Sequence, residues 1–142
     1  MKWKLNLNHE FQVEKKLIFW RNFLEINDYN GLFNLMDDLK SGYSEEDIYK
    51  ISKSPEYRGY LCYHQDIPMA VVIANLEEDS IYTIEFLHIF EQFRNESMVE
   101  TFFSELLQRA WQQGIDIIYV NGDNDEKYLK KAFVKFNFRR IE

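Results

Sequence analysis

The sequence predicts a mixed α+β fold, a twisted mixed sheet with one parallel strand–helix–strand crossover. Its 142 residues match the usual size of one domain, so we expect a single domain over residues 1–142. Apolar residues make up 46% and charged residues 29%, which is the composition of a globular chain. The clearest helical periodicity runs from Val99 to Ala110, between two largely apolar segments. From all periodic segments together we expect about six to seven strands and about four to five helices.

The N-terminal part predicts one strand and then a long helix. Residues Lys2–Asn8 alternate polar side chains with Trp3, Leu5 and Leu7, the period-two pattern of a strand with one buried face. From about Glu10–Asn27 the apolar residues recur near helical spacing, which predicts a core-facing helix.

Two shorter helices are expected next. The apolar residues of Leu32–Leu39 predict the first. Ser44 followed by Asp47 resembles a capping signal that opens the second around Ile48. Pro55 then marks a connection.

A meander of three strands follows. Arg58–Tyr63 and Met69–Leu76 are rich in aromatic and β-branched residues and are joined across His64–Asp66, which predicts a hairpin. The polar turn Glu77–Ser80 then leads into a third long strand, Ile81–Phe90. We therefore expect these three strands to pair antiparallel.

The last third of the chain predicts the crossover. The apolar residues of the Val99–Ala110 helix follow a regular i, i+3, i+4 spacing, and Gly114 stands where the helix should end. The apolar run Ile115–Val120 is then a strand parallel to the one before the helix. A turn at Asn121–Asp123 leads to a helix with one apolar face and to a short last strand, Asn137–Ile141. That apolar face consists of Leu129, Ala132, Phe133 and Phe136.

Composition excludes several function classes. A net charge of −7 argues against general nucleic-acid binding. The longest apolar runs fall far short of the ~20 residues of a membrane span, and no cleavable signal follows Met1, so we expect a cytoplasmic protein and no membrane partner. Cys62 is the only cysteine, which excludes an internal disulfide, and the three histidines lack metal-ligand spacing.

The charge is uneven along the chain. Between Lys127 and Glu142 there are six basic residues and one acidic one. Two interpretations stay open: a solvated helix face, or a basic rim for an anionic cofactor.

Two segments carry a resemblance to a known family. Leu87–Arg94 is an apolar-x-apolar run that leads to an aromatic-Arg pair, and the strong helix follows at once. Ala132–Phe138 is similar to a segment in which a Tyr stands four residues before a closing Gly-Phe. With the order of elements, these segments resemble the GCN5-related N-acetyltransferase (GNAT) superfamily over nearly the whole chain. The resemblance implies the GNAT fold and acetyl-CoA or another acyl-CoA as cofactor.

The loop before the strong helix is where the resemblance places the cofactor's pyrophosphate. A pyrophosphate is held by backbone N–H groups at a helix N-terminus, and glycine lets that backbone approach closely. The family's loop reads R-x-x-G-x-G or Ala, whereas this chain has Ser97 and Val99 at the two small positions and keeps Arg94. Glu96 adds negative charge beside them. The resemblance therefore implies that Leu87, Ile89, Arg94, Asn95, Ser97 and Val99 bind the cofactor.

The same loop residues also fit an ordinary helix start. Asn95 or Ser97 would be the N-cap, and Glu96 would favour the positive end of the helix dipole. That interpretation predicts weak cofactor binding by the natural loop and stronger binding after Glu96→Gly with Ser97→Gly.

The resemblance also suggests catalytic groups. In the family a strand glutamate often relays the proton of the base and a Tyr donates one to the thiolate. Glu85 is the candidate base here, and its alternative is an outward-facing residue that shares a face with Thr83 and Leu87. Phe133 occupies the matched tyrosine position, and a phenyl ring cannot donate a proton. Tyr128, which lies off the helical face of Phe133, and Tyr119 are weaker replacements.

Three functions follow as hypotheses. The first is a GNAT-like acyl-CoA-dependent N-acyltransferase, active or diverged, whose acceptor is an amine on a small molecule or a protein. The second is a non-catalytic GNAT-fold protein that binds a protein partner through its aromatic-rich N-terminal helices. The third is an unrelated α+β interaction module. Binding of acetyl-CoA separates the first from the other two.

Overall fold

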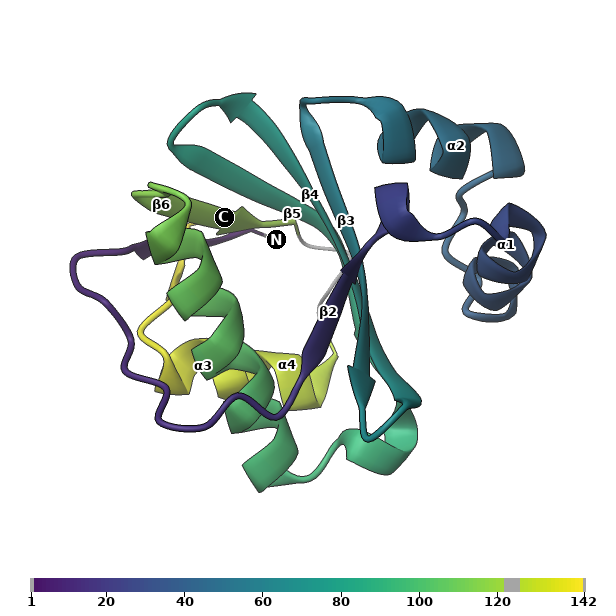
Figure 1. Ribbon diagram of the computed structural model, residues 1–142. Helices are drawn as coiled ribbons and strands as arrows, with labels where there is room; N and C mark the ends of the chain where they lie inside the picture. Colours follow the sequence, from purple (N-terminus) through teal and green to yellow (C-terminus); the bar gives the residue numbers. More distant parts are fainter. Residues whose placement is uncertain (1, 122–125, 142) are drawn as a thin grey trace.

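The computed structural model describes residues 2–121 and 126–141, and one seven-stranded sheet forms its centre (Figure 1). The strands are β1 (Trp3–Asn6), β2 (Phe19–Asn22), β3 (Tyr57–His64), β4 (Ile67–Glu78), β5 (Ile81–Ile89), β6 (Ile117–Val120) and β7 (Arg139–Arg140). They lie in the order β2-β3-β4-β5-β6-β1-β7. Within the described residues β5 and β6 are the parallel pair, and the other neighbours run antiparallel. The predicted mixed sheet with one parallel crossover is confirmed.

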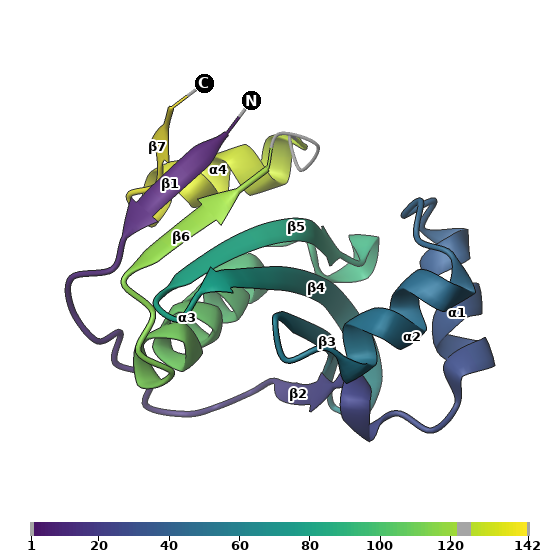
Figure 2. The same cartoon turned by 90° about the horizontal axis from the view of Figure 1, so that it is seen from above.

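Helices cover both faces of the sheet. They are α1 (Tyr29–Asp38), α2 (Glu45–Lys53), α3 (Glu96–Gln112) and α4 (Lys127–Lys135), with short 3-10 turns η1 (Phe23–Glu25) and η2 (Glu91–Phe93). Figures 1 and 2 show α3 and α4 on one face and α1 and α2 on the other. None of the helices in the described part of the chain is long and apolar enough to cross a membrane.

Each face of the sheet has its own apolar core. The larger core lies under α3 and α4, and its fully buried members include Phe102, Phe103, Leu107 and Phe133. The smaller core lies under α1 and α2, and it includes Leu32, Met36, Ile48, Ile51, Val71 and Ile73. The apolar residues of α3 that repeat at helical spacing are therefore buried.

Local signals in the sequence account for the helix ends. Ser44 and Asp47 form a capping box, because the Asp47 N–H donates to Ser44 Oγ at 3.1 Å and the Ser44 N–H donates to the Asp47 carboxylate at 2.9 Å. Asn95 is the N-cap of α3 and accepts from Met98 N at 2.9 Å. The helix is followed by Gly114 at φ +79°, a left-handed conformation that glycine adopts without strain.

The helix predicted over Glu10–Asn27 is wrong. Residues 7–18, which we call the strap, are irregular and run beside α3, and β2 and η1 follow them (Figure 1). The N–H groups of Leu17 and Ile18 donate to the buried Glu105 carboxylate at 2.9 and 3.2 Å. Trp20 lies on β2, which pairs with β3. These long-range contacts satisfy backbone groups that a helix would otherwise satisfy locally.

The first strand pairs at the far end of the sheet. β1 lies between β6 and β7, with Trp3 opposite Val120 on one side and Arg140 on the other. The predicted terminal strand is therefore present as the short β7. The predicted turn at Asn121–Asp123 falls mainly on residues outside those that the structure describes.

A bulge interrupts β5 at Glu85. Phe86 pairs with Ile73, but the next pair along the strands is Ile84 with Ala74, so Glu85 is an extra residue. One extra residue shifts the side-chain alternation of everything beyond it.

The bulge corrects the expected faces of β5. The sequence pattern placed Glu85 and Leu87 on one face, but Leu87 joins Ile84 in the larger core. Glu85 instead lines a cavity on the α2 side of the sheet. Without the bulge its carboxylate would share the face of Leu87.

Candidate functional site

The site begins where β5 and β6 separate. Their parallel pairing spans Ile81–Ile84 and Ile117–Val120, and Asn121 N donates to Ile84 O at 3.1 Å just beyond it. From Glu85 to Ile89, β5 continues while β6 turns away, as Figure 2 shows. The two strands therefore splay apart beyond Ile84. A divergence of adjacent parallel strands is a common place for a ligand in sheets of this kind.

A cavity of about 810 Å³ lies on one side of the splay. We call it the α2–β5 cavity, because the α1–α2 connection, α2 and the far half of β5 form its walls. Its charged lining residues are Lys40, Asp47, Lys50, Glu85 and Glu126.

Glu85 shares this cavity with neutral polar groups. Burial, and to a smaller degree the Glu85 carboxylate, raise the pKa of Tyr43 well above its usual value, so the phenol stays protonated and can donate. His88 also lines the cavity, between the rings of Phe86 and Phe90 at 6.4 and 5.5 Å. The cavity therefore combines a carboxylate with hydrogen-bonding groups held by aromatic packing.

A second cavity, of about 600 Å³, lies on the α3 side. We call it the α3–α4 groove. Arg94, Asn95 and Val99 line one wall, as expected for the loop and the start of α3, and α4 forms the other. Ser97 does not line it; this residue lies beside a small depression next to the strap.

Three lysines of α4 face the groove. Lys127, Lys131 and Lys135 are spaced i, i+4, i+8 and so lie along one side of the helix. Lys135 is paired across the groove with Glu100, and lies 3.8 Å from Glu96. Lys127 and Lys131 have no ion pair among the described residues.

The ion pairs of Lys135 reduce the negative charge at the start of α3. The groove lining holds four basic residues (Arg94, Lys127, Lys131, Lys135) and three acidic ones (Glu96, Glu100, Glu126), so a small positive excess remains, with Lys127 and Lys131 outside the ion pairs. This arrangement supports the interpretation of the basic C-terminal segment as a rim for an anionic ligand.

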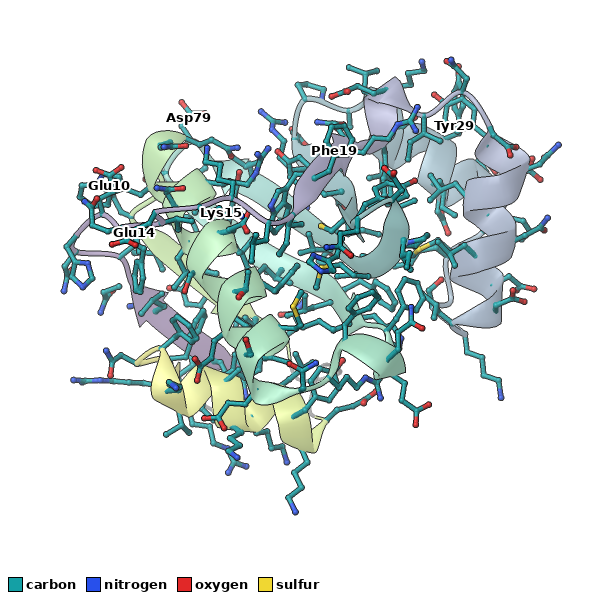
Figure 3. All side chains as sticks on the ribbon, turned by 60° about the horizontal axis from the view of Figure 1, so that its bottom comes forward. Glu10, Glu14, Lys15, Phe19, Tyr29 and Asp79 are labelled. Carbon is teal, nitrogen blue, oxygen red and sulfur yellow. The ribbon has the colours of Figure 1, made fainter. Side chains whose placement is uncertain are left out.

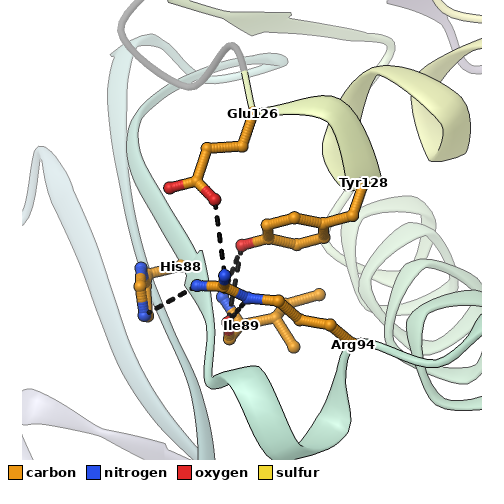
Figure 4. Close-up of polar contacts among 5 residues, drawn as sticks. All are labelled: His88, Ile89, Arg94, Glu126 and Tyr128. Atoms are coloured by element: carbon orange, nitrogen blue, oxygen red, sulfur yellow. Dashed lines mark hydrogen bonds and ion pairs between the residues drawn. The ribbon is translucent and has the colours of Figure 1, made fainter.

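Arg94 links the two cavities (Figure 4). Its Nε donates to Ile89 O at 2.7 Å, and its Nη1 lies 3.5 Å from the carboxylate of Glu126, which lines both cavities. Its guanidinium carbon lies 4.5 Å from the ring centre of Tyr128. The Tyr128 hydroxyl accepts from Ile89 N at 3.1 Å.

The contact between Arg94 and His88 defines the state of the histidine. Arg94 Nη2 lies 3.3 Å from His88 Nε2, and a guanidinium can only donate, so the imidazole is neutral and accepts through Nε2. Burial, and next the Arg94 charge, lower the pKa of His88. His88 is thus held as a neutral polar group.

Phe133 and Tyr128, the two α4 residues considered as the catalytic tyrosine, lie in different surroundings. Phe133 is fully buried against Trp3, Phe103 and Phe138, with ring centres 5.2, 5.7 and 5.2 Å away. The matched tyrosine position therefore points into the core. Tyr128 lies off that helical face, as expected, but this is what brings its hydroxyl to the end of β5.

Sequence reasoning did not single out Glu126, and it gave Tyr128 little weight. The lysine spacing on α4 was the available signal, because it marks the side of the helix next to these residues. Cys62 is fully buried, and burial raises the pKa of its thiol, so it is a core residue.

Comparison with known proteins gives matches at the level of structure. No family model and no curated protein sequence matches the chain. The N-acetyltransferase PseH of Campylobacter jejuni, in complex with acetyl coenzyme A, matches with a TM-score of 0.66 and 12% identity over 89% of this chain and 91% of that chain. The Escherichia coli protein YhhK, a putative N-acetyltransferase bound to coenzyme A, matches with a TM-score of 0.67 and 12% identity over 88% and 93%.

A third match is the aminoglycoside N-acetyltransferase AAC(6')-Iy in complex with coenzyme A. Its TM-score is 0.65 at 10% identity, over 92% of this chain and 94% of that chain. At such identities the likeness establishes the fold. The chain has the GNAT fold, which confirms the fold that the sequence resemblance implied.

Proposed function

We propose that the chain is an acyl-CoA-dependent N-acyltransferase. The observation that carries this proposal is the splay of β5 and β6 with a cavity on each side of it and a shared wall between them. Transfer between two substrates needs two such spaces that meet at one place. PseH and AAC(6')-Iy, two of the structural neighbours, are N-acetyltransferases, which supports the same reaction class.

The α3–α4 groove fits the cofactor by the chemistry of its lining. Arg94, Lys127 and Lys131 would pair with phosphate oxygens, and Val99 and Ala132 give the groove an apolar floor. The N-terminus of α3 adds the partial positive charge of its dipole. Bound acyl-CoA supplies the acyl group as an activated thioester.

The α2–β5 cavity would take the acceptor amine. An amine must lose a proton before it attacks, and Glu85 is the carboxylate on the β5 wall that could accept this proton directly or through a water. The neutral Tyr43 and His88 would hydrogen-bond the rest of the acceptor. The lining carries three carboxylates (Asp47, Glu85, Glu126) against two lysines (Lys40, Lys50), and this negative excess suits a cationic acceptor such as an amine-bearing small molecule.

The test is release of free thiol from acetyl-CoA in the presence of a panel of amines. The panel contains aminoglycosides, polyamines, amino sugars and lysine peptides. We expect release that depends on at least one cationic amine and that is lost after Arg94→Ala. No saturable binding of acetyl-CoA and no thiol release with any amine would favour the alternative, a non-catalytic GNAT-fold protein with a protein partner.

A further inference from the structure

Both backbone polar groups of Ile89 are already occupied by side chains. Its N–H donates to the Tyr128 hydroxyl at 3.1 Å, and its C=O accepts from Arg94 Nε at 2.7 Å. Ile89 lies at the end of β5, beyond the point where β6 has turned away. The N–H of Ile89 therefore points to the open side of the strand, where a ligand would form hydrogen bonds with it.

The side chains of Arg94 and Tyr128 also contact each other. The Arg94 guanidinium lies over the Tyr128 ring and pairs with the carboxylate of Glu126 at 3.5 Å (Figure 4). Arg94 and Tyr128 come from opposite walls of the α3–α4 groove. Together the three side chains bridge the loop before α3 and the start of α4 across the end of β5.

We propose that Arg94, Glu126 and Tyr128 form a latch that covers the end of β5 and opens when a phosphate-bearing ligand pairs with Arg94. The ligand is the acyl-CoA of the proposed function, on which this inference rests. A pyrophosphate competes with Glu126 for one guanidinium, and turning Arg94 to the groove leaves Ile89 O with only the long contact from the Tyr128 hydroxyl at 3.5 Å. Tyr128 then loses its cationic neighbour, and its hydroxyl can leave Ile89 N.

The ion pair between Arg94 and Glu126 is weak enough for the latch to open. The Glu126 side chain is 54% exposed, and an ion pair with an exposed partner is weak, so little opposes its exchange for a phosphate. Glu126 also lines both cavities, so its release changes the wall between them. The latch thus couples arrival of the cofactor to the space where the acceptor would meet it.

Coenzyme A binding to Tyr128→Phe tests the latch. The variant keeps the ring over Arg94 and removes only the hydroxyl that occupies Ile89 N. We expect a Kd for coenzyme A about three- to tenfold lower than that of the natural chain, because the ligand no longer displaces a hydrogen bond. Isothermal titration calorimetry measures it, and Tyr119→Phe is the matched control, since Tyr119 lines neither cavity.

The outcomes separate the latch from the proposed function. An unchanged or higher Kd for Tyr128→Phe, with the natural chain binding coenzyme A, would overturn the latch alone. If neither chain binds, the proposed function fails, and the latch fails with it. Hydrogen exchange of the Ile89 amide gives a readout without ligand: it should speed up in Tyr128→Phe and not in Tyr119→Phe, and equal exchange in all three chains would also overturn the latch.

Discussion

The side chain of Glu85 faces the α2–β5 cavity because β5 has a bulge at this residue. The bulge turns its carboxylate to the α2–β5 cavity, beside the neutral Tyr43 and His88. Nothing in the surrounding sequence marks a bulge at this point, since no glycine lies near it. A simple alternation therefore assigned the wrong neighbours to this side chain.

We expect Glu85→Gln to lower kcat by about a hundredfold or more if Glu85 is the general base. The amide keeps the size of the side chain but cannot take a proton, so Kd for acetyl-CoA should change little. Steady-state kinetics with the best amine of the panel measures kcat. Glu78→Gln, at the exposed end of the β4–β5 hairpin, is the control and should leave kcat unchanged. Equal rates for the two variants would remove Glu85 from the mechanism.

His88 predicts a dependence of stability on pH. Because its pKa is lowered in the folded chain, the unfolded chain binds its proton more readily. The neutral His88 therefore contributes its full share to the free energy of unfolding above the ordinary pKa of 6.5. This contribution is lost as the pH falls through the lower pKa that His88 has in the folded chain. Urea unfolding at about pH 7 and about pH 5 should show the natural chain losing more stability than His88→Asn. A larger loss in the variant would contradict a neutral, buried imidazole.

At the scale of elements, the strap shows how a distant residue decides local structure. Glu105 of α3 is buried and accepts from Leu17 N, Ile18 N and, at 3.3 Å, Trp20 Nε1. The carboxylate thus fixes the strap and the start of β2 on α3.

Glu105→Ala should lower the free energy of unfolding by about 1–3 kcal/mol, because it leaves one buried and two partly buried N–H donors without their acceptor. Urea denaturation measures the loss, and hydrogen exchange should locate it at the amides of Leu17 and Ile18. Glu14→Ala is the control, since this exposed strap residue (Figure 3) has no such role. A similar small effect from both variants would show that the carboxylate does not anchor the strap.

The contrast between α3 and the strap shows what the sequence can predict. The apolar residues of α3 repeat at helical spacing, and their burial follows from that period alone. The strap has apolar residues at similar spacing, but its backbone hydrogen bonds go to Glu105, which is 88 residues from Leu17 in the chain. A contact of such separation is not visible in a local pattern, so the predicted helix was wrong.

The candidate site also has residues that could be predicted from the sequence and residues that could not. The resemblance to the GNAT family implied that Arg94, Asn95, Ser97 and Val99 bind the cofactor, and of these Arg94, Asn95 and Val99 line the α3–α4 groove whereas Ser97 does not. The contact of Tyr128 with Ile89 depends on how α4 approaches the end of β5, which no spacing within α4 specifies. Sequence patterns thus predict the parts of the site that one element carries, and the meeting of elements needs the structure.

For the whole molecule, the sheet brings together parts of the chain that are far apart in sequence. α2 and β5 enclose the proposed acceptor space, and α3 and α4 enclose the proposed cofactor space on the opposite side. Of the latch residues (Figure 4), Glu126 lines both spaces, and Arg94 and Tyr128 line the proposed cofactor space. The proposed function depends on this arrangement more than on any single residue.

Mapping the backbone amide shifts of the labelled chain during a titration with acetyl-CoA tests this arrangement most directly. We expect saturable shifts at Ile89, at Arg94–Val99 and at Lys127–Lys131, and little change on β2 or β7. Arg94→Ala should weaken the binding and leave the same residues affected. No shifts at high ligand concentration, or shifts gathered away from the splay of β5 and β6, would contradict the proposal that this chain holds acyl-CoA between α3 and α4.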